Sequence, residues 1–375
     1  MQFRDLHAQY LALKPEIDAG IQSVIDSSVF ILGKPVAELE EKLANYVGRK
    51  YCVTCANGTE ALQLSLMVMD IGAGDAVFTS DFTYFASAGC AAILGVTPVL
   101  VDIDLNTFNM SPEALEKAII KVIEEGKLTP KAVIPVDLFG LPADYDRIIP
   151  IAEKYGLTVL EDAAQGFGGS LHGRRACSFG DISATSFFPA KPLGCYGDGG
   201  AIFTDDVDVD ARLRSLRASG KSPEDKYDNR EVGMNSRLDT LQAAILLPKF
   251  KAFVNYELKD INNVASIYEN ALSGKVLTPE VPDGFYSSWA QYTILLDNQE
   301  TRSSVQKKLK EHNIPSMIYY PRGLHQQAAF AGMNLSDELY PNTIEAVRRC
   351  LSLPIHPYMK EEEQKMVISV LLEAL

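Results

Sequence analysis

The sequence predicts an α/β fold, with a large domain built on a mostly parallel central sheet and a smaller C-terminal α/β domain. Short apolar runs alternate with stretches in which apolar residues recur every three or four positions, as in the crossover units of parallel sheets. The chain has 375 residues, of which 47% are hydrophobic and 22% charged, enough for a large core. Its length favours about two domains, which we expect at 1–250 and 251–375.

Seven apolar runs of the large domain are predicted strands, because each is short and rich in β-branched or aromatic residues. In chain order they are 50–54, 76–79, 97–102, 132–138, 158–161, 184–188 and 200–204. Helical spacing of apolar residues fills most of the intervals, for example in 61–69 and 148–152. Parallel sheets of this kind place ligands at the carboxyl ends of their strands, so the functional residues should follow the strands.

After residue 204 the alternation of strands and helices changes. Residues 205–217 predict a polar helix, and 236–253 predict a strongly amphipathic helix with Leu238 and Ile245 at helical spacing. Helices and short strands then alternate to the end, and 291–296 is a predicted strand. This change of pattern places the domain boundary within about ten residues of position 250.

Charge and composition exclude several classes of protein. Lys and Arg number 35 against 49 Asp and Glu, a net charge of −14, so nucleic acid and anionic membrane are not expected as partners. The longest uncharged run, 82–101, contains Gly95 and Pro98 and does not predict a membrane span. The N-terminus carries no basic segment followed by an apolar block, so we expect a cytoplasmic protein without a secretory signal.

The six cysteines are too sparse for a disulfide scaffold. Cys52 and Cys55 form a C-x-x-C pair, but no second ligand pair accompanies it and no thioredoxin-like context surrounds it. We therefore expect these cysteines to be structural, and we predict no metal site.

Three segments that follow predicted strands carry candidate chemistry. In the first, 56–62, Gly58 and Thr59 lead into a helical pattern, where free backbone amides could bind an anion. A capped helix start is the alternative. In the second, Asp162 closes an apolar strand, where a carboxylate needs a cationic partner unless it is a structural strand-end residue.

The third segment places Lys191 after an aromatic strand and before the glycine-rich turn 194–200. A desolvated lysine in such surroundings has a lowered pKa and a nucleophilic amine, although a lysine snorkelling from a turn is the alternative. Together, an anion site, Asp162 and Lys191 match the needs of pyridoxal 5′-phosphate: a phosphate cradle, a partner for the pyridinium nitrogen and an amine for the aldehyde. A dinucleotide-binding site is the alternative, but its G-x-G-x-x-G motif is missing. The nearest match is 166–169, and Leu171 stands where the motif requires its third glycine.

In these motifs the sequence resembles the fold-type I, pyridoxal phosphate-dependent nucleotide-sugar aminotransferases of the DegT/StrS family. The likeness covers essentially the whole chain, from 3–6 to 353–358, and is most distinctive in 186–201 and 235–245. Within the family, the sequence is most similar to enzymes that aminate C3 of UDP-2-acetamido-2-deoxy-3-oxo-glucuronate.

The resemblance implies roles around the cofactor. Lys191 would hold the aldehyde covalently and move the proton, and Asp162 would keep the pyridine nitrogen protonated. Gln165 would lie near the ring hydroxyl and Tyr84 would stack on the ring, unless Tyr84 is a core residue. The residues that would hold the phosphate are Gly58, Thr59 and Ser186.

The resemblance also implies a homodimer with shared active sites, in which Asn235 would reach the phosphate of the neighbouring subunit's cofactor. Arg237 would help to bind the sugar. Where the similar enzymes carry His-Tyr in a substrate-contacting loop, this chain has Tyr319-Tyr320, and Arg322 follows where an apolar residue is common. Arg322 could supply a donor for a carboxylate or pyrophosphate, or it could be a solvated loop residue.

We therefore expect an aminotransferase that converts a 3-oxo nucleotide sugar to its 3-amino form with glutamate as donor, releasing 2-oxoglutarate, in cell-surface (lipopolysaccharide or O-antigen) polysaccharide biosynthesis. Amination at C4, or of a dTDP-linked sugar, is the alternative within the same fold. Lys191 argues against a dehydratase of this fold, which carries His at that position. A regulator of similar fold would need an added DNA-binding domain, for which an acidic chain of this length has no room.

Overall fold

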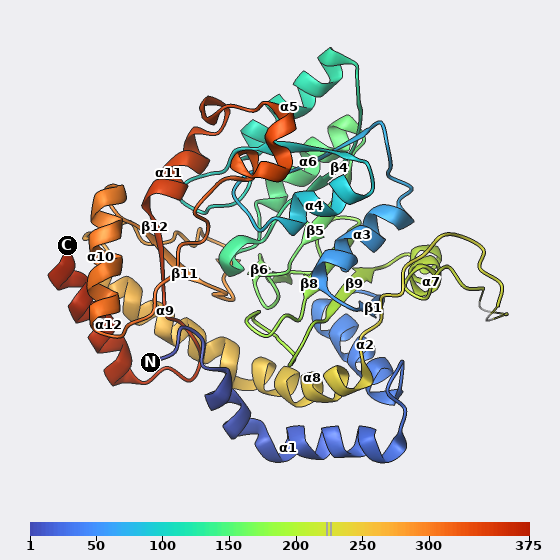
Figure 1. Cartoon of the computed structure of the whole chain (residues 1–375), viewed down its shortest axis with the longest axis horizontal. Helices are drawn as coiled ribbons and strands as arrows, with labels where there is room; N and C mark the ends of the chain where they lie inside the picture. The colour runs from blue at the N-terminus through green and yellow to red at the C-terminus, as the bar shows by residue number, and fades with distance from the viewer. Residues whose placement is uncertain (223, 226) are drawn as a thin grey trace.

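The computed structural model describes residues 1–222, 224–225 and 227–375. Its large domain is built on a seven-stranded sheet, part of which is labelled in Figure 1. The strand order is β1-β9-β8-β5-β4-β2-β3, and only β9 runs antiparallel to both of its neighbours. The strands are β1 (Tyr51–Cys55), β2 (Asp75–Ser80), β3 (Thr97–Val101), β4 (Thr129–Ile134), β5 (Thr158–Asp162), β8 (Ile182–Ser186) and β9 (Gly200–Thr204). Each predicted strand overlaps one of these, so the predicted α/β class is confirmed.

Two strand predictions need the largest corrections. The run 184–188 is placed two residues too late at both ends, because β8 begins at Ile182 and ends at Ser186. The run 132–138 was expected to be strand throughout, but β4 begins at Thr129 and ends at Ile134. Pro135 has no amide hydrogen to donate to a neighbouring strand, and the chain then turns into the short 3₁₀-helix η1 (Leu138–Gly140).

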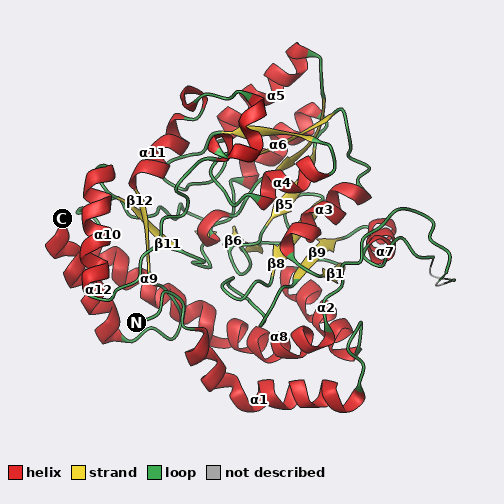
Figure 2. Cartoon of the chain, viewed as in Figure 1, coloured by secondary structure: helices red, strands yellow, loops and turns green. Residues whose placement is uncertain are grey.

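Helices cover both faces of the sheet (Figure 2). The helices of one face are α3 (Gly58–Val68), α4 (Ala86–Ile93) and α7 (Val207–Leu216), and those of the other are α2 (Lys34–Val47), α5 (Pro112–Glu125) and α6 (Tyr145–Tyr155). Alternate residues of β1, β2, β4, β5 and β9 enter different hydrophobic clusters, as the two-residue period of a strand requires. Cys52 and Cys55 are free and buried in different clusters, on opposite faces of β1, so they do not form a joint site.

The predicted amphipathic helix 236–253 differs from the observed α8 (Thr240–Ala252) in its start and in its burial. It begins four residues later than predicted, and it lies between α1 (Leu6–Ser27) and α2 (Figure 2). Ala243, Leu246 and Phe250 pack in the cluster that contains α2, whereas Ile245 and Ala252 pack against α1. Because both sides are covered, the helix has no solvated face of the predicted kind.

A separate C-terminal core forms around the antiparallel pair β11 (Tyr292–Leu295) and β12 (Cys350–Leu353), which confirms the strand predicted at 291–296. The helices here are α9 (Leu258–Leu272), α10 (Gln299–Glu311), α11 (Pro341–Arg349) and α12 (Glu361–Ala374). A continuous helical segment, α8 followed by the π-helical turn η2 (Phe253–Glu257) and α9, links this core to the large domain. The boundary near residue 250 stays a prediction.

The remaining elements are short. They are the strands β6 (Ser170–Leu171), β7 (Arg174–Arg175) and β10 (Phe285–Tyr286) and the 3₁₀-helices η3 (Leu324–Gln326), η4 (Ala328–Met333) and η5 (Asp337–Leu339). Within the described ranges, no helix combines the length and the apolar character needed to cross a bilayer.

Candidate active site

A cavity of about 870 Å³ opens where β5 and β8 end and the C-terminal part of the chain approaches the sheet. Ten of the twelve predicted site residues line it. The large domain contributes Gly58, Thr59, Tyr84, Asp162, Gln165, Ser186 and Lys191. The C-terminal part contributes Tyr319, Tyr320 and Arg322. A larger groove, about 1030 Å³, lies beside α9 and contains none of these residues.

The N-terminus of α3 forms one wall of this cavity and can bind an anion. Asn57 caps the helix by accepting a hydrogen bond from the amide of Glu60 at 2.8 Å. The amides of Gly58 and Thr59 belong to the first turn and have no acceptor within the helix. The segment is therefore both a capped helix start and a source of free donors, so the two readings of this motif are compatible.

Ser186 lies against this turn at the end of β8. A Cβ atom on Gly58 would stand only 2.6 Å from the Cβ of Ser186, so the close approach requires glycine. The Ser186 hydroxyl oxygen accepts from the amide of Phe188 at 3.2 Å and keeps its hydrogen free to donate. Two backbone amides and one hydroxyl thus line the same part of the cavity and form a cradle that can donate to a phosphate.

Asp162 is a buried carboxylate without a hydrogen-bonded cation among the described residues. Only 4% of it is exposed, and its oxygens accept from the Ser87 hydroxyl at 2.8 Å and from the Ala164 amide at 3.1 Å. Burial raises its pKa, while Ser87, Ala164 and the charge of Lys191 act in the opposite direction. A carboxylate in this position is stabilised by a cation placed in the cavity. Sequence analysis missed Ser87, which has no distinguishing pattern.

Lys191 lies in the loop after β8, held by a hydrogen bond from its amide to the carbonyl oxygen of Phe188 at 2.8 Å. Its pKa is lowered to about 8, chiefly by burial; the charge of Asp162 opposes the shift, and the charge of Arg4 adds to it. Its amine therefore loses its proton more readily than that of an exposed lysine. A neutral amine is a nucleophile toward carbonyl groups.

Gln165 and Tyr320 connect the sheet to the loop that contains Tyr319 and Arg322. The Gln165 side chain accepts from the amide of Phe139 at 2.9 Å and donates to the hydroxyl of Tyr320 at 3.0 Å. Tyr84 is 57% exposed within the cavity wall, so the core reading of this tyrosine is wrong. Arg322 is exposed and also faces the cavity.

An Asp–His contact that sequence analysis missed attaches this loop to the large domain. Asp81, directly after β2, accepts from the backbone amide of His325 at 2.8 Å, and its second oxygen lies 2.6 Å from His325 Nδ1. The carbonyl oxygen of Asp81 also accepts from the amide of Leu324 at 2.8 Å. Asp81 follows its strand as Asp162 ends its own, so the strand-end rule could have found it.

Asn235 and Arg237 are the two predicted residues that do not line the cavity. Asn235 was expected at the start of a helix, but it is exposed in the segment before α8 and forms a bridge with Ala218. A role in the same subunit's cavity is therefore not supported for Asn235. The predicted role in a neighbouring subunit stays a prediction.

The donor set of the cavity fits pyridoxal 5′-phosphate. The cradle at Gly58, Thr59 and Ser186 matches a phosphate, the buried carboxylate of Asp162 matches a protonated ring nitrogen, and the amine of Lys191 matches an aldehyde.

Comparisons with known proteins agree with this chemistry. The sequence model of the DegT/DnrJ/EryC1/StrS aminotransferase family matches residues 12–372. The chain is 45% identical, over 99% of both sequences, to the UDP-2-acetamido-2-deoxy-3-oxo-D-glucuronate aminotransferase of Pseudomonas aeruginosa. It is 40% identical to a pleiotropic regulatory protein of Geobacillus stearothermophilus, over 98% of this chain and 97% of that one.

Solved structures are similar over the whole chain. The crystal structure of a DegT/DnrJ/EryC1/StrS aminotransferase from Brucella abortus has a TM-score of 0.96 and 46% identity, covering 100% of this chain and 99% of that one. S. venezuelae DesV, solved in complex with a ketimine intermediate, has a TM-score of 0.93 and 34% identity, with 100% and 98% covered. The chain therefore belongs to the DegT/DnrJ/EryC1/StrS family of aminotransferases, whose cofactor is pyridoxal 5′-phosphate.

Proposed function

We propose that the protein transfers an amino group from glutamate to C3 of a 3-oxo nucleotide sugar, with UDP-2-acetamido-2-deoxy-3-oxo-glucuronate as the substrate and 2-oxoglutarate as the co-product. One observation carries the proposal: the amine of Lys191, the carboxylate of Asp162 and the phosphate cradle share one cavity with the arginine-bearing loop. The name of the Pseudomonas relative supports the choice of sugar. A role in cytoplasmic lipopolysaccharide or O-antigen biosynthesis is part of the same proposal.

The cofactor, when bound, supplies an electron-withdrawing ring that accepts the negative charge left when a proton leaves the amino-bearing carbon. Lys191 would hold the aldehyde and would act as the acid–base group that takes up and returns that proton. Asp162 would keep the ring nitrogen protonated, and Tyr84 would contact the ring. Gln165, which donates to the hydroxyl of Tyr320 at 3.0 Å, would help to hold the ring hydroxyl.

The sugar enters on the side of the loop that contains Tyr319, Tyr320 and Arg322. A chain with a net charge of −14 repels a UDP-sugar acid at long range, so cations inside the cavity must attract it. Arg322 lines the cavity and is exposed there, so its guanidinium can reach an anionic substrate. We assign it to the uronate carboxylate, in place of the histidine that the similar enzymes carry in this loop. Arg237 does not line the cavity of its own subunit, so its role in binding the sugar rests on the family pattern alone.

Replacing Arg322 by Met is expected to raise KM for the uronate substrate about ten- to more than a hundredfold, because a charge-assisted hydrogen bond of roughly 1.5–3 kcal/mol is lost. A neutral UDP-sugar analogue assayed in parallel should be nearly unaffected. Equal losses for both sugars would assign Arg322 to the pyrophosphate. No loss for either would show that it is a surface residue.

The proposed reaction itself is tested by incubating the purified protein with glutamate and a panel of UDP- and dTDP-linked 3-oxo and 4-oxo sugars. We expect glutamate-dependent amination at C3 of the UDP-linked uronate. Faster amination of a dTDP-linked or 4-oxo sugar would replace the proposed substrate by the alternative and leave the family assignment untouched.

We also propose that the active unit is a homodimer whose sites each use Asn235 from the other subunit. Asn235 is exposed and outside its own cavity, and Val232 in the same segment is 88% exposed. Mixing inactive Lys191→Ala with inactive Asn235→Ala protein is expected to restore up to about a quarter of wild-type activity, because each hybrid dimer regains one intact site. Turnover by a monomer, measured by light scattering under assay conditions, would contradict this arrangement.

A further inference from the structure

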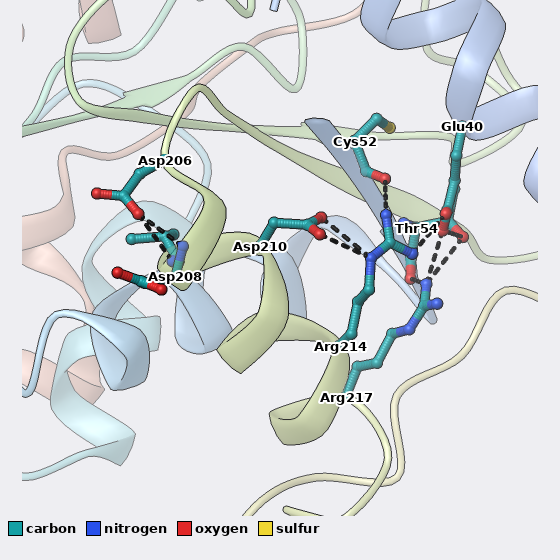
Figure 3. Close-up of polar contacts among 9 residues, drawn as sticks. Glu40, Cys52, Thr54, Asp206, Asp208, Asp210, Arg214 and Arg217 are labelled. Atoms are coloured by element: carbon teal, nitrogen blue, oxygen red, sulfur yellow. Dashed lines mark hydrogen bonds and ion pairs between the residues drawn. The ribbon is translucent and has the colours of Figure 1, made fainter. Parts of the chain in front are cut away.

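The open edge of β1 is covered by buried charges instead of a neighbouring strand. β1 is the outermost strand of the large sheet and pairs only with β9. The backbone groups that face away from β9 are bound by side chains (Figure 3). Thr54 donates its amide to Glu40 Oε1 at 2.9 Å, and its carbonyl oxygen accepts from Arg217 Nη1 at 2.8 Å. The carbonyl oxygen of Cys52 accepts from Arg214 at 3.1 Å.

Glu40 is the centre of this network. Its two oxygens accept from Arg217 at 2.7 Å and from Arg214 at 2.8 Å, and only 7% of Glu40 and 6% of Arg217 are exposed. Burial acts to raise the pKa of Glu40, but the two arginines outweigh it and lower that pKa, so the carboxylate is ionised at neutral pH. A buried ion pair usually stabilises a fold less than apolar packing would, so stability alone does not explain this network. We infer that the network holds nearby backbone groups in place.

Hydrogen bonds connect this ion network to the segment that precedes the phosphate cradle. Thr54 lies four positions before Gly58, and the intervening Ala56 donates its amide to the hydroxyl of Ser236 at 3.1 Å. The amide of Ser236 in turn donates to the carbonyl oxygen of Arg217 at 2.9 Å. Arg217 therefore fixes the segment before the cradle twice, once directly at Thr54 and once through Ser236.

On the side that faces β8 and β9, close packing holds the cradle in place. A Cβ atom on Gly200 would lie 2.6 Å from the carbonyl carbon of Asn57, and one on Gly58 would lie 2.6 Å from Ser186. The sheet thus limits movement of the turn inward, whereas the ion network limits movement of β1 outward.

We propose that Glu40 and Arg217 are positioning residues for the phosphate cradle: by holding Thr54 they fix the direction of the Gly58 and Thr59 amides and so set the affinity for the phosphate group. This inference rests on the proposed roles of Gly58, Thr59 and Ser186. It predicts that changing these residues weakens binding of the cofactor's phosphate group and leaves binding of its ring unchanged.

The test compares pyridoxal 5′-phosphate with pyridoxal, which has the same ring and aldehyde but no phosphate. The full chain is freed of cofactor and titrated with each compound, following the visible absorbance. Glu40→Gln is expected to raise Kd for pyridoxal 5′-phosphate about tenfold or more, as loss of about 1.4 kcal/mol requires. Its Kd for pyridoxal should stay unchanged, because the groups that contact the ring and aldehyde are not altered.

Asp210→Asn is the matched control. Asp210 belongs to the same network and accepts from Arg214 Nε at 3.0 and 3.1 Å, but it does not contact Thr54 (Figure 3). It should leave both dissociation constants unchanged. Equal weakening of the two compounds by Glu40→Gln, or equal effects of the two variants, would overturn the inference.

A second variant covers the case in which Glu40→Gln does not fold. Ser236→Ala removes only the hydroxyl that accepts from Ala56, and it is expected to weaken pyridoxal 5′-phosphate severalfold without affecting pyridoxal. No selective loss in this variant would overturn the inference. If the wild-type protein itself bound the two compounds equally, the cradle assignment would fail. Failure to aminate the proposed sugar would leave the positioning role intact.

Discussion

Replacing Lys191 by Ala is expected to lower transamination by about 10⁴-fold or more, because one amine is both the nucleophile for the aldehyde and the group that moves the proton. The fold should persist, since Lys191 faces the cavity and its side chain makes no hydrogen bond or ion pair with any described residue. The measurement is the rate of 2-oxoglutarate formation from glutamate, together with the loss of the visible absorbance of the bound cofactor. Far-UV circular dichroism reports on the fold.

Lys249 offers a matched control for this prediction. It is also buried, burial lowers its pKa to about 8 as well, and its ammonium lies 4.6 Å from the centre of the Tyr196 ring. It does not line the cavity, so Lys249→Met should retain nearly wild-type turnover. Normal transamination by Lys191→Ala, or an equal loss in both variants, would show that Lys191 has no catalytic role of its own despite its lowered pKa.

The sequence predicted the sheet well because the strands of its central part are buried on both faces. Runs such as 76–79 and 200–204 are apolar except for a threonine at the end, and observed β2 and β9 contain them entirely. Placement of the cavity followed from the same pattern, since Asp162 and Ser186 end their strands at the carboxyl edge of a mostly parallel sheet.

The errors concern features that depend on distant segments. The start and the burial of α8 were mispredicted because α1, more than 200 positions earlier, covers the side assigned to solvent. The contact between Asp81 and His325 joins residues 244 positions apart, and no periodicity within either segment reports it. Asn235 could not be assigned to a cavity from sequence spacing, because its predicted partner is a second copy of the chain.

The buried network around Glu40 was invisible in the sequence for a related reason. Its members come from α2, β1 and α7. The sequence around each one shows only a charged helix residue or an ordinary strand residue. Only the tertiary arrangement shows that two arginines and a glutamate replace the strand that β1 lacks on its outer edge.

Replacing Asp162 by Asn is expected to reduce kcat about 10³-fold while pyridoxal 5′-phosphate remains bound. Asn keeps the shape of the side chain and can still accept from the Ser87 hydroxyl, but it carries no charge to keep the ring nitrogen protonated. Removing an electrostatic group aimed at developing charge costs about 10²–10³ in kcat in comparable sites. The phosphate cradle and Lys191 hold the cofactor independently, so its Kd should change far less than kcat.

The kinetic signature separates this role from a structural one. With glutamate deuterated at the α-carbon, Asp162→Asn should show a larger primary isotope effect than the wild type, because removal of that proton becomes the slow step. Ser87→Ala, which removes only a hydrogen bond to the same carboxylate, should lower kcat modestly and leave the isotope effect close to wild type. A nearly normal kcat for Asp162→Asn would mean that the carboxylate only completes the end of β5. A tenfold or greater loss of cofactor affinity without the isotope effect would mean that it binds the ring but does not assist proton removal.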